Sequence, residues 1–590
     1  MPIPATLVHA LHAAPASETR GFHFVAGRGE DVRLSYAELA AEADRLGRKL
    51  REAGALPGER IGLIFPDPRD FVVSFFGALR AGLVPVPMYP PLSMGKLDAY
   101  MESATRILAT AGARRLLVAD SMAKLMWALV GSAKLADLHT VSGLAGPAKP
   151  MDLPLPEPGD VCFLQFTSGS TSDPKGVVVS HANLMANTRA QAVDGAALDP
   201  ETDRLVSWLP LYHDMGLIGF VVTPVVMGMD TWLIPTMSFV RQPNLWMETV
   251  HRVGGTISFA PNFAFALAAR RATDEHLARW DLSKLRLVGC GAEPIQAGTL
   301  RNFHTVFARA GMPATAALPA YGMAEATLAV SFKRRANEFR SLRVDAVELC
   351  ESGRVVEVPA DHAGPIQEFV SCGHVLPHHR VEIVDDAGAL LGEGVEGELV
   401  VYGPSVTAGY YENPVSTAAS FIGGGVRTGD LGFIHDGELY VSGRLKDLVI
   451  LNGKNVHPQS IEWVAAEVPG VRRGNVVAFS RPGENTEELV LAVERTTDGP
   501  PADELAKAVA AHVQESMGLA VADVVVIQAG ALPKTSSGKL QRRKTRDHYL
   551  AGALGTEGVR TMGAGAERLT AAKHLARSLF ARVKHGITGG

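Results

Sequence analysis

The stretch from Phe166 to His181 reads Phe-Thr-Ser-Gly-Ser-Thr-Ser-Asp-Pro-Lys-Gly-Val-Val-Val-Ser-His. Its first half groups hydroxyl side chains around one glycine: Thr167, Ser168, Gly169, Ser170 and Thr171. Hydroxyls and closely spaced backbone N–H groups are the donors that wrap a phosphate. Lys175 adds a compact positive charge, and the apolar run Val177 to Val179 predicts a strand that anchors the loop. A Ser/Thr-rich surface turn before a strand is the alternative interpretation.

A Walker phosphate loop is a different motif, and this chain does not contain one. Its three Gly-Lys pairs begin at Gly95, Gly453 and Gly538 and are followed by Leu, Asn and Leu. The Walker motif requires Ser or Thr at that place. The sequence therefore argues against a P-loop kinase or ATPase.

Size and composition indicate an ordinary globular enzyme of several domains. The chain has 590 residues and a hydrophobic fraction of 47%, and its length exceeds what one core usually supports. A net charge of −5 provides no general attraction to nucleic acid or to an anionic membrane. The four cysteines are far apart in sequence, so we expect reduced thiols in a cytoplasmic protein and no zinc site: Cys162, Cys290, Cys350 and Cys372.

Two segments bear on membrane association. The N-terminus lacks a basic region followed by an apolar one, so no secretion signal is expected. The most apolar window runs from Gly216 to Pro235 but is interrupted by Pro224 and Asp230. We expect this window to be buried structure and not a membrane span.

Helical and strand patterns alternate through the first half of the chain. Ser35 and Glu38 form a capping-box pattern that predicts a helix toward Ala53, and Phe71 to Ala81 predicts another. Further segments read as buried strands: Arg60 to Phe65, Arg115 to Ala119, Leu205 to Leu209, Thr256 to Phe259 and Leu285 to Cys290. This alternation predicts parallel α/β layers.

Three later stretches carry candidate binding groups. Gly289 to Pro294 follows a strand, where glycines permit close approach of a flat ligand, although an ordinary strand-to-helix turn would look the same. Tyr321-Gly322-Met323-Ala324-Glu325 places an aromatic ring and a carboxylate four residues apart. Arg427 to Gly432 contains Asp430, whose carboxylate can accept hydrogen bonds from two hydroxyls, although Asp after Gly is also common in turns.

Together, these stretches resemble the signature motifs of the adenylate-forming enzymes, which include acyl-CoA synthetases, luciferases, peptide-synthetase adenylation domains and fatty acyl-AMP ligases. The match extends from about Leu34 to Leu550. One departure is Ser172, where many members carry glycine.

The resemblance implies a nucleotide site. Gly291, Ala292 and Glu293 would form the loop that faces adenine, and Tyr321, with Gly322 and Met323 beside it, would stack on the base. Asp430 would bind the ribose, and Arg444 would approach the nucleotide. Glu325 would hold Mg²⁺ against the triphosphate, with Thr171 from the phosphate loop as a second ligand.

The resemblance also implies catalytic roles. Lys539, in the loop from Pro533 to Arg542, matches the adenylation lysine of the family, and Lys446 occupies its hinge position. A lone His such as His213 is more often structural, but its counterpart in the family lies at the carboxylate end of the acyl pocket. The segment from Leu217 to Met237 would then line an acyl tunnel, whereas by itself it indicates core.

Some features resemble fatty acyl-AMP ligases specifically. They include Ser238 to Pro243 and Ala260 to Phe265. An insertion of about residues 333–370 contains a hairpin-like pattern from Val347 to Val358, which predicts an extra strand pair. In the resembling ligases such an insertion restricts the domain movement that CoA requires; a neutral surface decoration is the alternative.

The expected fold is therefore α/β, of the adenylate-forming type. A large N-terminal domain of layered α/β subdomains, residues 1–443, would precede a small, mobile α+β lid domain, residues 444–550. Residues 551–590 would be a basic tail with a linker and a short helix, either a docking element for an acidic carrier protein or membrane, or functionless.

The expected reaction is activation of a fatty acid by ATP and Mg²⁺ to an acyl-adenylate, with release of pyrophosphate. The acyl group would pass to the phosphopantetheine thiol of an acyl carrier protein. We expect a cytoplasmic monomer that binds no nucleic acid. The alternatives are a fatty acyl-CoA synthetase, an amino-acid adenylating enzyme and a non-catalytic nucleotide- or lipid-binding relative.

Overall fold

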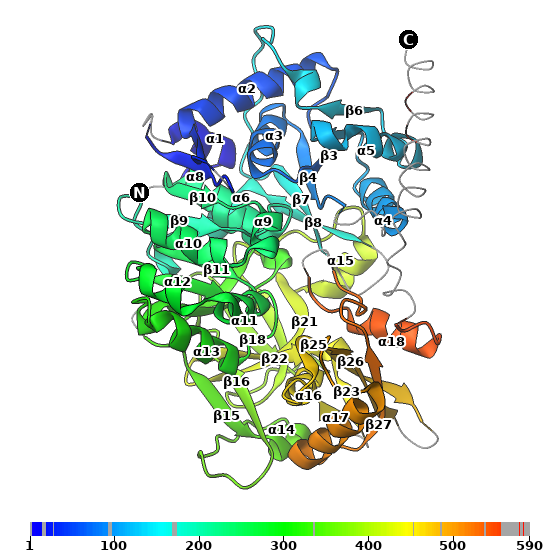
Figure 1. Cartoon of the computed structure of the whole chain (residues 1–590). Helices are drawn as coiled ribbons and strands as arrows, with labels where there is room; N and C mark the ends of the chain where they lie inside the picture. The colour runs from blue at the N-terminus through cyan, green and yellow to red at the C-terminus, as the bar shows by residue number, and fades with distance from the viewer. Residues whose placement is uncertain are drawn as a thin grey trace.

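The computed structural model describes residues 3–14, 19–27, 29–91, 97–167, 174–333, 337–451, 454–483, 487–535 and 538–555, together with Ser578 and Arg582. A nine-stranded sheet lies at its centre, in the middle of Figure 1. In sheet order the strands are β17 (His374–Val375), β14 (Ala329–Phe332), β13 (Ala317–Gly322), β12 (Leu287–Cys290), β11 (Ile257–Ala260), β9 (Arg204–Ser207), β10 (Asp230–Leu233), β1 (Gly21–Phe24) and β2 (Val32–Ser35). The strands from β13 to β1 in this order run parallel, as the alternating pattern predicted.

Helices before and between these strands build the surrounding layers. They are α1 (Leu7–Ala13), α6 (His181–Thr188), α7 (Asp214–Leu217), α8 (Thr223–Met227), α9 (Thr236–Arg241), α10 (Asn244–Val253), α11 (Asn262–Arg271), α12 (Asp274–Arg279) and α13 (Ala297–Ala308). The π-helical turns Arg189–Gly195 and Ile218–Val222 continue α6 and α7. The apolar window from Gly216 to Pro235 is mostly buried here, as expected.

A second, smaller parallel sheet lies above the first in Figure 1. Its strands and helices are β4 (Val84–Met88), β3 (Arg60–Ile64), β5 (Arg115–Val118), β6 (Asp137–Thr140), α2 (Tyr36–Glu52), α3 (Pro68–Arg80), α4 (Leu97–Thr110) and α5 (Asp120–Ser132). The predicted capping box at the start of α2 is present, because Ser35 accepts from the N–H of Glu38 and the Glu38 carboxylate accepts from the N–H of Ser35. The predicted helix is confirmed.

Two antiparallel units also belong to the part of the chain up to residue 444. The hairpin of β7 (Val161–Thr167) and β8 (Lys175–Ser180) flanks the phosphate-loop sequence. A five-stranded sheet comprises β18 (Arg380–Val384), β19 (Gly397–Tyr402), β20 (Phe421–Ile422), β21 (Gly425–His435) and β22 (Glu438–Arg444), with α15 (Pro414–Ser420) beside it. β22 leads directly into the C-terminal segment.

The segment after β22 has a hydrophobic core of its own, which includes Val449, Ile461, Leu491 and Val509. Its elements are β23 (Val449–Leu451), β24 (Lys454–Val456), α16 (Pro458–Ala465), β25 (Val471–Pro482), β26 (Glu487–Arg495), α17 (Ala502–Met517), β27 (Val521–Ile527) and α18 (Arg542–Leu550). It lies at the bottom of Figure 1 in yellow and orange. We refer to residues 444–550 as the C-terminal segment.

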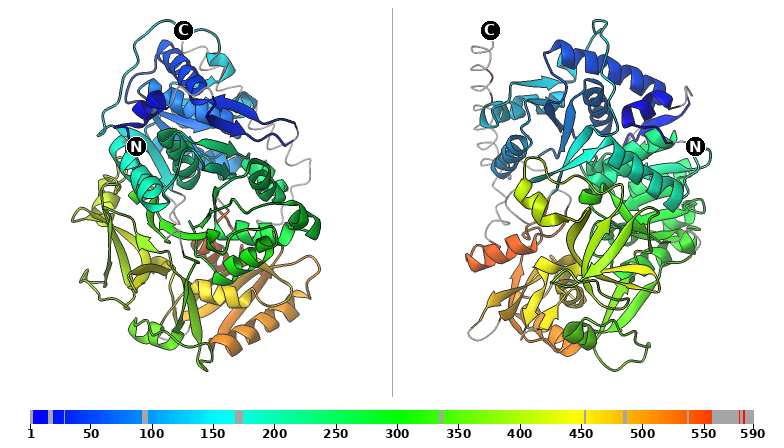
Figure 2. Two further views of the ribbon diagram at one scale, coloured as in Figure 1. Left: turned by 90° about the vertical axis from the view of Figure 1, so that its left-hand side faces the viewer. Right: turned by 180° about the vertical axis from the view of Figure 1, so that it is seen from behind.

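The insertion differs from its prediction in one respect. Its strand pair is formed by β15 (Ser341–Asp345) and β16 (Ile366–Val370), and not within Val347 to Val358. The structure instead places helix α14 (Ala346–Ser352) there, so the hairpin prediction was wrong. Local capping explains the helix, because Asp345 accepts from the first free N–H groups and Gly353 ends the helix at φ 69°. Figure 2 shows the insertion beside the C-terminal segment from two further directions.

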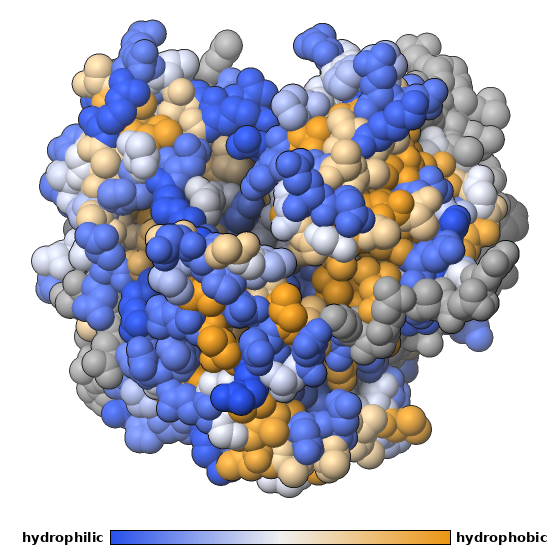
Figure 3. Space-filling model, turned by 90° about the horizontal axis from the view of Figure 1, so that it is seen from below, coloured by the Kyte–Doolittle hydropathy of each residue, from blue (hydrophilic) through white to orange (hydrophobic). Residues whose placement is uncertain are grey.

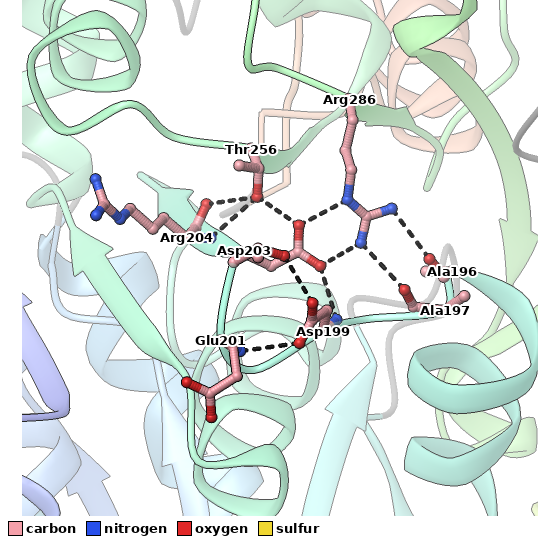
Figure 4. A network of polar contacts seen from close by, with 9 residues as sticks. Ala196, Ala197, Asp199, Glu201, Asp203, Arg204, Thr256 and Arg286 are labelled. Carbon is pink, nitrogen blue, oxygen red and sulfur yellow. Dashed lines mark hydrogen bonds and ion pairs between the residues drawn. The ribbon is translucent and has the colours of Figure 1, made fainter. Parts of the chain in front are cut away.

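A buried ionic network joins the amino ends of three central strands (Figure 4). Asp203 precedes β9, Thr256 precedes β11 and Arg286 precedes β12. The Arg286 guanidinium binds both carboxylate oxygens of Asp203, with Nε 2.6 Å from Oδ1, and Thr256 donates to the same oxygen at 2.8 Å. This network lies at the sheet edge opposite the carboxyl ends of the strands, so it holds the sheet and leaves the other edge for ligands.

The face seen from below mixes charged and apolar side chains and is hollowed near its centre (Figure 3). Among the described residues, no helix is both long and apolar enough to cross a bilayer.

Candidate active site

The candidate nucleotide loops leave two neighbouring parallel strands at the same edge of the central sheet. β12 ends at Cys290, which pairs with Pro319 of β13. Residues 291–293 follow directly, while Tyr321 and Gly322 end β13. Ligands of open α/β sheets bind at the carboxyl ends of parallel strands. The structure therefore brings the two predicted loops together at a binding edge.

The backbones of both loops approach their neighbours closely. A Cβ atom at Gly291 would lie 2.9 Å from the carbonyl oxygen of Ala320, and one at Gly322 would lie 2.0 Å from that of Leu328. Ala292 adopts φ 70°, a left-handed conformation that costs energy for any residue except glycine. Strained backbone of this kind clusters at ligand sites.

Asp430 links the strand β13 to the end of β22. Tyr321 donates its hydroxyl to Oδ2 of Asp430 at 2.7 Å, and Arg444 Nε lies 3.0 Å from Oδ1. Burial raises the pKa of Tyr321, so its hydroxyl stays protonated as a donor, and the charge of Asp430 raises the pKa of Arg444. The Arg444 side chain is 63% exposed, so its charge remains accessible to a ligand.

Glu325 and Lys175 both contact Tyr410. Tyr410 donates its hydroxyl to Oε1 of Glu325 at 2.8 Å, and Lys175 Nζ lies 4.8 Å from the centre of the Tyr410 ring. Strand β8 aligns these groups, because Val177 pairs with Tyr410. Burial raises the pKa of Glu325, and the hydrogen bond from Tyr410 opposes that effect.

Lys539 reaches the central sheet from the C-terminal segment. Burial lowers its pKa, and the nearby carboxylates of Asp214 and Glu293 oppose that effect. His213 Nδ1 lies 2.5 Å from Oδ1 of Asp214. Burial would raise the pKa of Asp214, but the charges of His213 and Lys539 bring it below its ordinary value. A lysine, a histidine and two carboxylates therefore lie close enough to interact electrostatically.

A tight loop presents Lys539. Thr535 Oγ1 accepts from the Lys539 N–H at 3.1 Å, and the Lys539 carbonyl accepts from the Thr535 N–H at 2.8 Å. Gly538 adopts φ 88°, and a Cβ there would lie 4.0 Å from the ring of Phe263. Phe263 begins α11, and its N–H donates to Oε1 of Glu293 at 2.9 Å. Gly538, at the tip of the loop, therefore lies close to helix α11, whose Phe263 N–H orients Glu293.

The phosphate-loop sequence is flanked by paired strand ends. Thr167 of β7 pairs with Lys175 of β8, so the loop between them starts and ends at one place. The remaining predicted loop residues lie outside the described residues: Ser168, Gly169, Ser170 and Thr171.

An apolar cavity of about 60 Å³ lies beside the residues that precede His213. Its lining includes Phe65, Phe71, Leu211, Tyr212, Leu233 and Met237. The end of the predicted tunnel segment therefore contributes to the wall. Because one water occupies ~30 Å³ of liquid, a long acyl chain requires side chains to move here.

The predicted hinge residue Lys446 lies in the 3-10 turn Leu445–Asp447. Asp447 in the same turn accepts from Arg542 Nη1 at 2.7 Å. This turn connects β22 to β23, the first strand of the C-terminal segment.

Sequence reasoning did not predict three residues that contact the candidate site residues His213, Glu325 and Glu293. Asp214 directly follows His213, and this adjacency was the available signal. Tyr410 and Phe263 carry no local signal, because Glu325 and Glu293 lie 85 and 30 positions away from them. No cluster of three or more metal-ligating side chains occurs within the part of the chain that the structure describes.

Known proteins show the same sequence pattern. The AMP-binding enzyme family matches residues 12–411. A protein of Caulobacter vibrioides, provisionally named an acyl-CoA synthetase, is 40% identical over 93% of this chain and 96% of its own length. The long-chain-fatty-acid–AMP ligase FadD32 of Mycolicibacterium smegmatis is 35% identical over 88% of this chain and 89% of its own.

Solved structures of fatty acyl-adenylate ligases are similar to this chain as well. A structure from a study of fatty acyl-adenylate ligases of E. coli and L. pneumophila has a TM-score of 0.88 and 35% identity, covering 93% of this chain and 99% of that one. The L. pneumophila fatty acyl-adenylate ligase in complex with acyl adenylate and pyrophosphate has a TM-score of 0.70 and 30% identity, covering 93% and 96%. The chain therefore belongs to the AMP-binding, adenylate-forming enzymes, among which it groups with the fatty acyl-AMP ligases.

Proposed function

We propose that this protein activates a fatty acid with ATP to an acyl-adenylate and then transfers the acyl group to the phosphopantetheine thiol of an acyl carrier protein. The observation that carries the proposal is the position of Lys539. It comes from the C-terminal segment, yet it interacts electrostatically with Asp214 and Glu293 at the edge of the central sheet. A protein that only binds nucleotide has no chemical need for a lysine delivered in this way.

The first step joins a carboxylate oxygen to the α-phosphorus of ATP and breaks the bond to pyrophosphate. Negative charge accumulates around that phosphorus, so the reaction needs alignment and positive charge more than an enzyme nucleophile. Lys539 would bridge the carboxylate and the α-phosphate, and His213 would lie at the carboxylate end of the acyl site. Lys175 would bind the β and γ phosphates.

The nucleotide would lie across the two loops at the carboxyl edge of the sheet. The turn of Gly291, Ala292 and Glu293 would face adenine, opposite Tyr321. Asp430 would accept from the ribose hydroxyls, since each carboxylate oxygen accepts more than one hydrogen bond. Its bonds to Tyr321 and Arg444 would hold it in position.

Glu325 fits a magnesium site. Mg²⁺ is usually bound through one or two carboxylates plus substrate phosphates, and Glu325 is a carboxylate that accepts a hydrogen bond from Tyr410, whose ring Lys175 also contacts. Glu325 would hold the ion, with Thr171 as a second ligand, and the bound ion would neutralise charge on the leaving pyrophosphate. Tyr410 orients the carboxylate for that contact.

We also propose the domain division that this mechanism needs. Residues 1–443 would form the large domain, residues 444–550 a mobile lid that turns about Lys446, and residues 551–590 a basic tail. The separate hydrophobic core around Ile461 and Val509 supports a lid that moves as one body.

The second candidate is a fatty acyl-CoA synthetase, which the provisional name of the Caulobacter relative favours. The insertion favours the first candidate. Its Cys350 thiol donates to the carbonyl oxygen of Asn455 at 2.7 Å, so α14 contacts the C-terminal segment and would oppose its rotation.

Product analysis separates these functions. The protein is incubated with ATP, Mg²⁺ and mixed fatty acids, with either CoA or a phosphopantetheinylated carrier protein, and products are identified by mass spectrometry. We expect acyl-adenylate in all reactions and acyl-carrier in preference to acyl-CoA. Efficient acyl-CoA formation would establish the second candidate. Pyrophosphate exchange that depends on an amino acid, or nucleotide binding without pyrophosphate release, would refute both.

A further inference from the structure

We infer that His457 and Glu396 form a latch between the two proposed domains that positions Lys539 for adenylation. His457 begins the C-terminal segment's helix α16 and is only 2% exposed. Its Nε2 atom lies 3.0 Å from Oε1 of Glu396, which precedes β19 of the large domain. The inference rests on the proposed function and identifies the contact that would keep the lid in its adenylating orientation.

The imidazole of His457 packs against residues of the large domain on two sides. Phe369, from strand β16 of the insertion, packs edge-on against the ring with centroids 6.2 Å apart. On another side, a Cβ atom added to Gly443 would lie 2.7 Å from Nδ1 of His457. Glycine at this position therefore makes room for the ring immediately before the hinge turn.

The surroundings of the pair favour the ionised form of the Glu396 carboxylate. Burial raises the pKa of Glu396, but His457, together with the Ser442 hydroxyl, brings that pKa below its ordinary value. A buried carboxylate that loses its partner is strongly destabilised. The docked orientation of the C-terminal segment therefore gains stability from this contact.

Side-chain contacts connect the latch to the catalytic loop. Glu462 lies on α16, five positions after His457, and its Oε1 accepts from Arg542 Nη2 at 2.7 Å. Arg542 also binds Asp447 of the hinge turn and the carbonyl oxygen of Ala478. Arg542 begins α18 three positions after Lys539. The orientation of α16 thus fixes the base of the loop that carries the lysine.

The insertion strengthens the latch. The Cys350 thiol binds the carbonyl oxygen of Asn455, two positions before His457, and Phe369 contacts the ring itself. The insertion and the ionic pair would therefore hold the same short segment of the lid.

The test uses the full chain with the substitutions His457→Ala and Glu396→Gln. Fatty-acid-dependent pyrophosphate exchange gives kcat and KM for ATP, and we expect kcat to fall about tenfold with little change in KM, since loss of a buried charged partner shifts a conformational equilibrium. The matched control is His512→Ala. His512 pairs with Glu467 at 3.4 Å on the surface of the C-terminal segment, where such pairs contribute little.

Amide hydrogen exchange provides a readout that does not depend on catalysis. We expect faster exchange in residues 445–451 of both latch variants and unchanged exchange in strand β12. Equal acceleration in both regions would indicate general destabilisation and overturn the inference, as would unchanged kcat and exchange. If His457→Ala fails to fold, Glu396→Gln decides alone. A wild-type protein that makes no acyl-adenylate refutes the proposed function, while the exchange experiment still tests the latch.

Discussion

The surroundings of Lys539 affect both the pKa and the position of its ammonium group. Burial lowers its pKa, whereas the carboxylates of Asp214 and Glu293 favour the charged form. The same two carboxylates would hold the ammonium group in place before substrates arrive. A positive charge that is positioned in advance stabilises a crowded phosphorus more than a mobile lysine could.

Replacement of Lys539 by alanine tests this role. Loss of one group that stabilises the transition-state charge typically costs ~2.7–4 kcal/mol, so we expect adenylation at least ~100-fold slower. The measurement is fatty-acid-dependent pyrophosphate exchange. Lys544→Ala, an exposed lysine on the adjacent helix α18, is the control and should behave as wild type. Activity of Lys539→Ala within tenfold of wild type would remove the residue from the mechanism.

Tyr410 is expected to control the protonation of Glu325. Its hydroxyl lowers the pKa of that carboxyl, which burial raises. Tyr410→Phe keeps the ring beside Lys175 but removes the hydrogen bond, so the Glu325 pKa should rise further. Because metal binding needs the ionised carboxylate, the acidic limb of the pH–rate profile should move to higher pH.

Pyrophosphate exchange measured across pH values checks this expectation. Tyr411→Phe is the matched control, since the Tyr411 hydroxyl binds Glu412 at the surface. An acidic limb at the same pH in Tyr410→Phe and wild type would contradict the assignment of Glu325 as the metal ligand.

At the scale of elements, the amino and carboxyl ends of the central strands differ in role: one end is stabilised by an ion pair, and the other carries the candidate binding loops. The carboxyl edge carries the strained turn at Ala292 and the close backbone approach at Gly322. The amino edge is held by the Asp203–Arg286 pair (Figure 4). Rigid strands between the two edges allow a loop to be held in an unfavourable conformation, because the sheet supplies the stabilisation that the loop lacks.

Asp203→Ala should destabilise the sheet without altering the chemistry. Removal of one partner of a buried ion pair costs ~3–5 kcal/mol, so we expect thermal unfolding several degrees below wild type. Burial opposes ionisation of Asp203, but Arg286 holds its pKa below the ordinary value. The stabilisation from the Asp203–Arg286 pair is therefore fully present above the pKa that Asp203 has in the unfolded chain. It is lost as pH falls through the pKa that Asp203 has in the folded protein.

Circular dichroism at neutral and acidic pH measures both effects. Glu201→Ala is the control, because Glu201 is 74% exposed in its pair with Arg20 and should contribute less than ~1 kcal/mol. Equal melting temperatures for the two variants at neutral pH would show that the network does not stabilise the sheet.

At the scale of the whole molecule, we propose that the insertion and the lid decide which acceptor is used. Replacing residues 346–365 by Asn-Gly removes α14 and joins Asp345 to Ile366, which already pair across the hairpin. We expect the variant to retain adenylation and to gain some acyl-CoA synthesis, because the lid loses the Cys350 contact. Mass spectrometry with CoA as acceptor is the measurement, and a folded variant that makes no acyl-CoA would show that α14 is not the gate.

Much of the fold could be predicted because its signals are local. The capping box at Ser35, the strand pattern from Leu285 to Cys290 and the turn after it depend on residues within one element. The insertion shows the limit of such patterns. The alternation around Val347 indicated strands, but Asp345 and Gly353 capped a helix there.

The sequence by itself predicted the layered α/β architecture, because strand periodicity is a pattern of neighbouring positions, and its resemblance to the adenylate-forming enzymes identified Lys539, Glu325 and Asp430 as candidate site residues. Only the tertiary structure decided that Tyr410 bonds Glu325 and that His457 meets Glu396. Those partners lie 85 and 61 positions apart in the chain. No periodicity records such contacts, since they arise only when separately formed elements pack and exclude water between them.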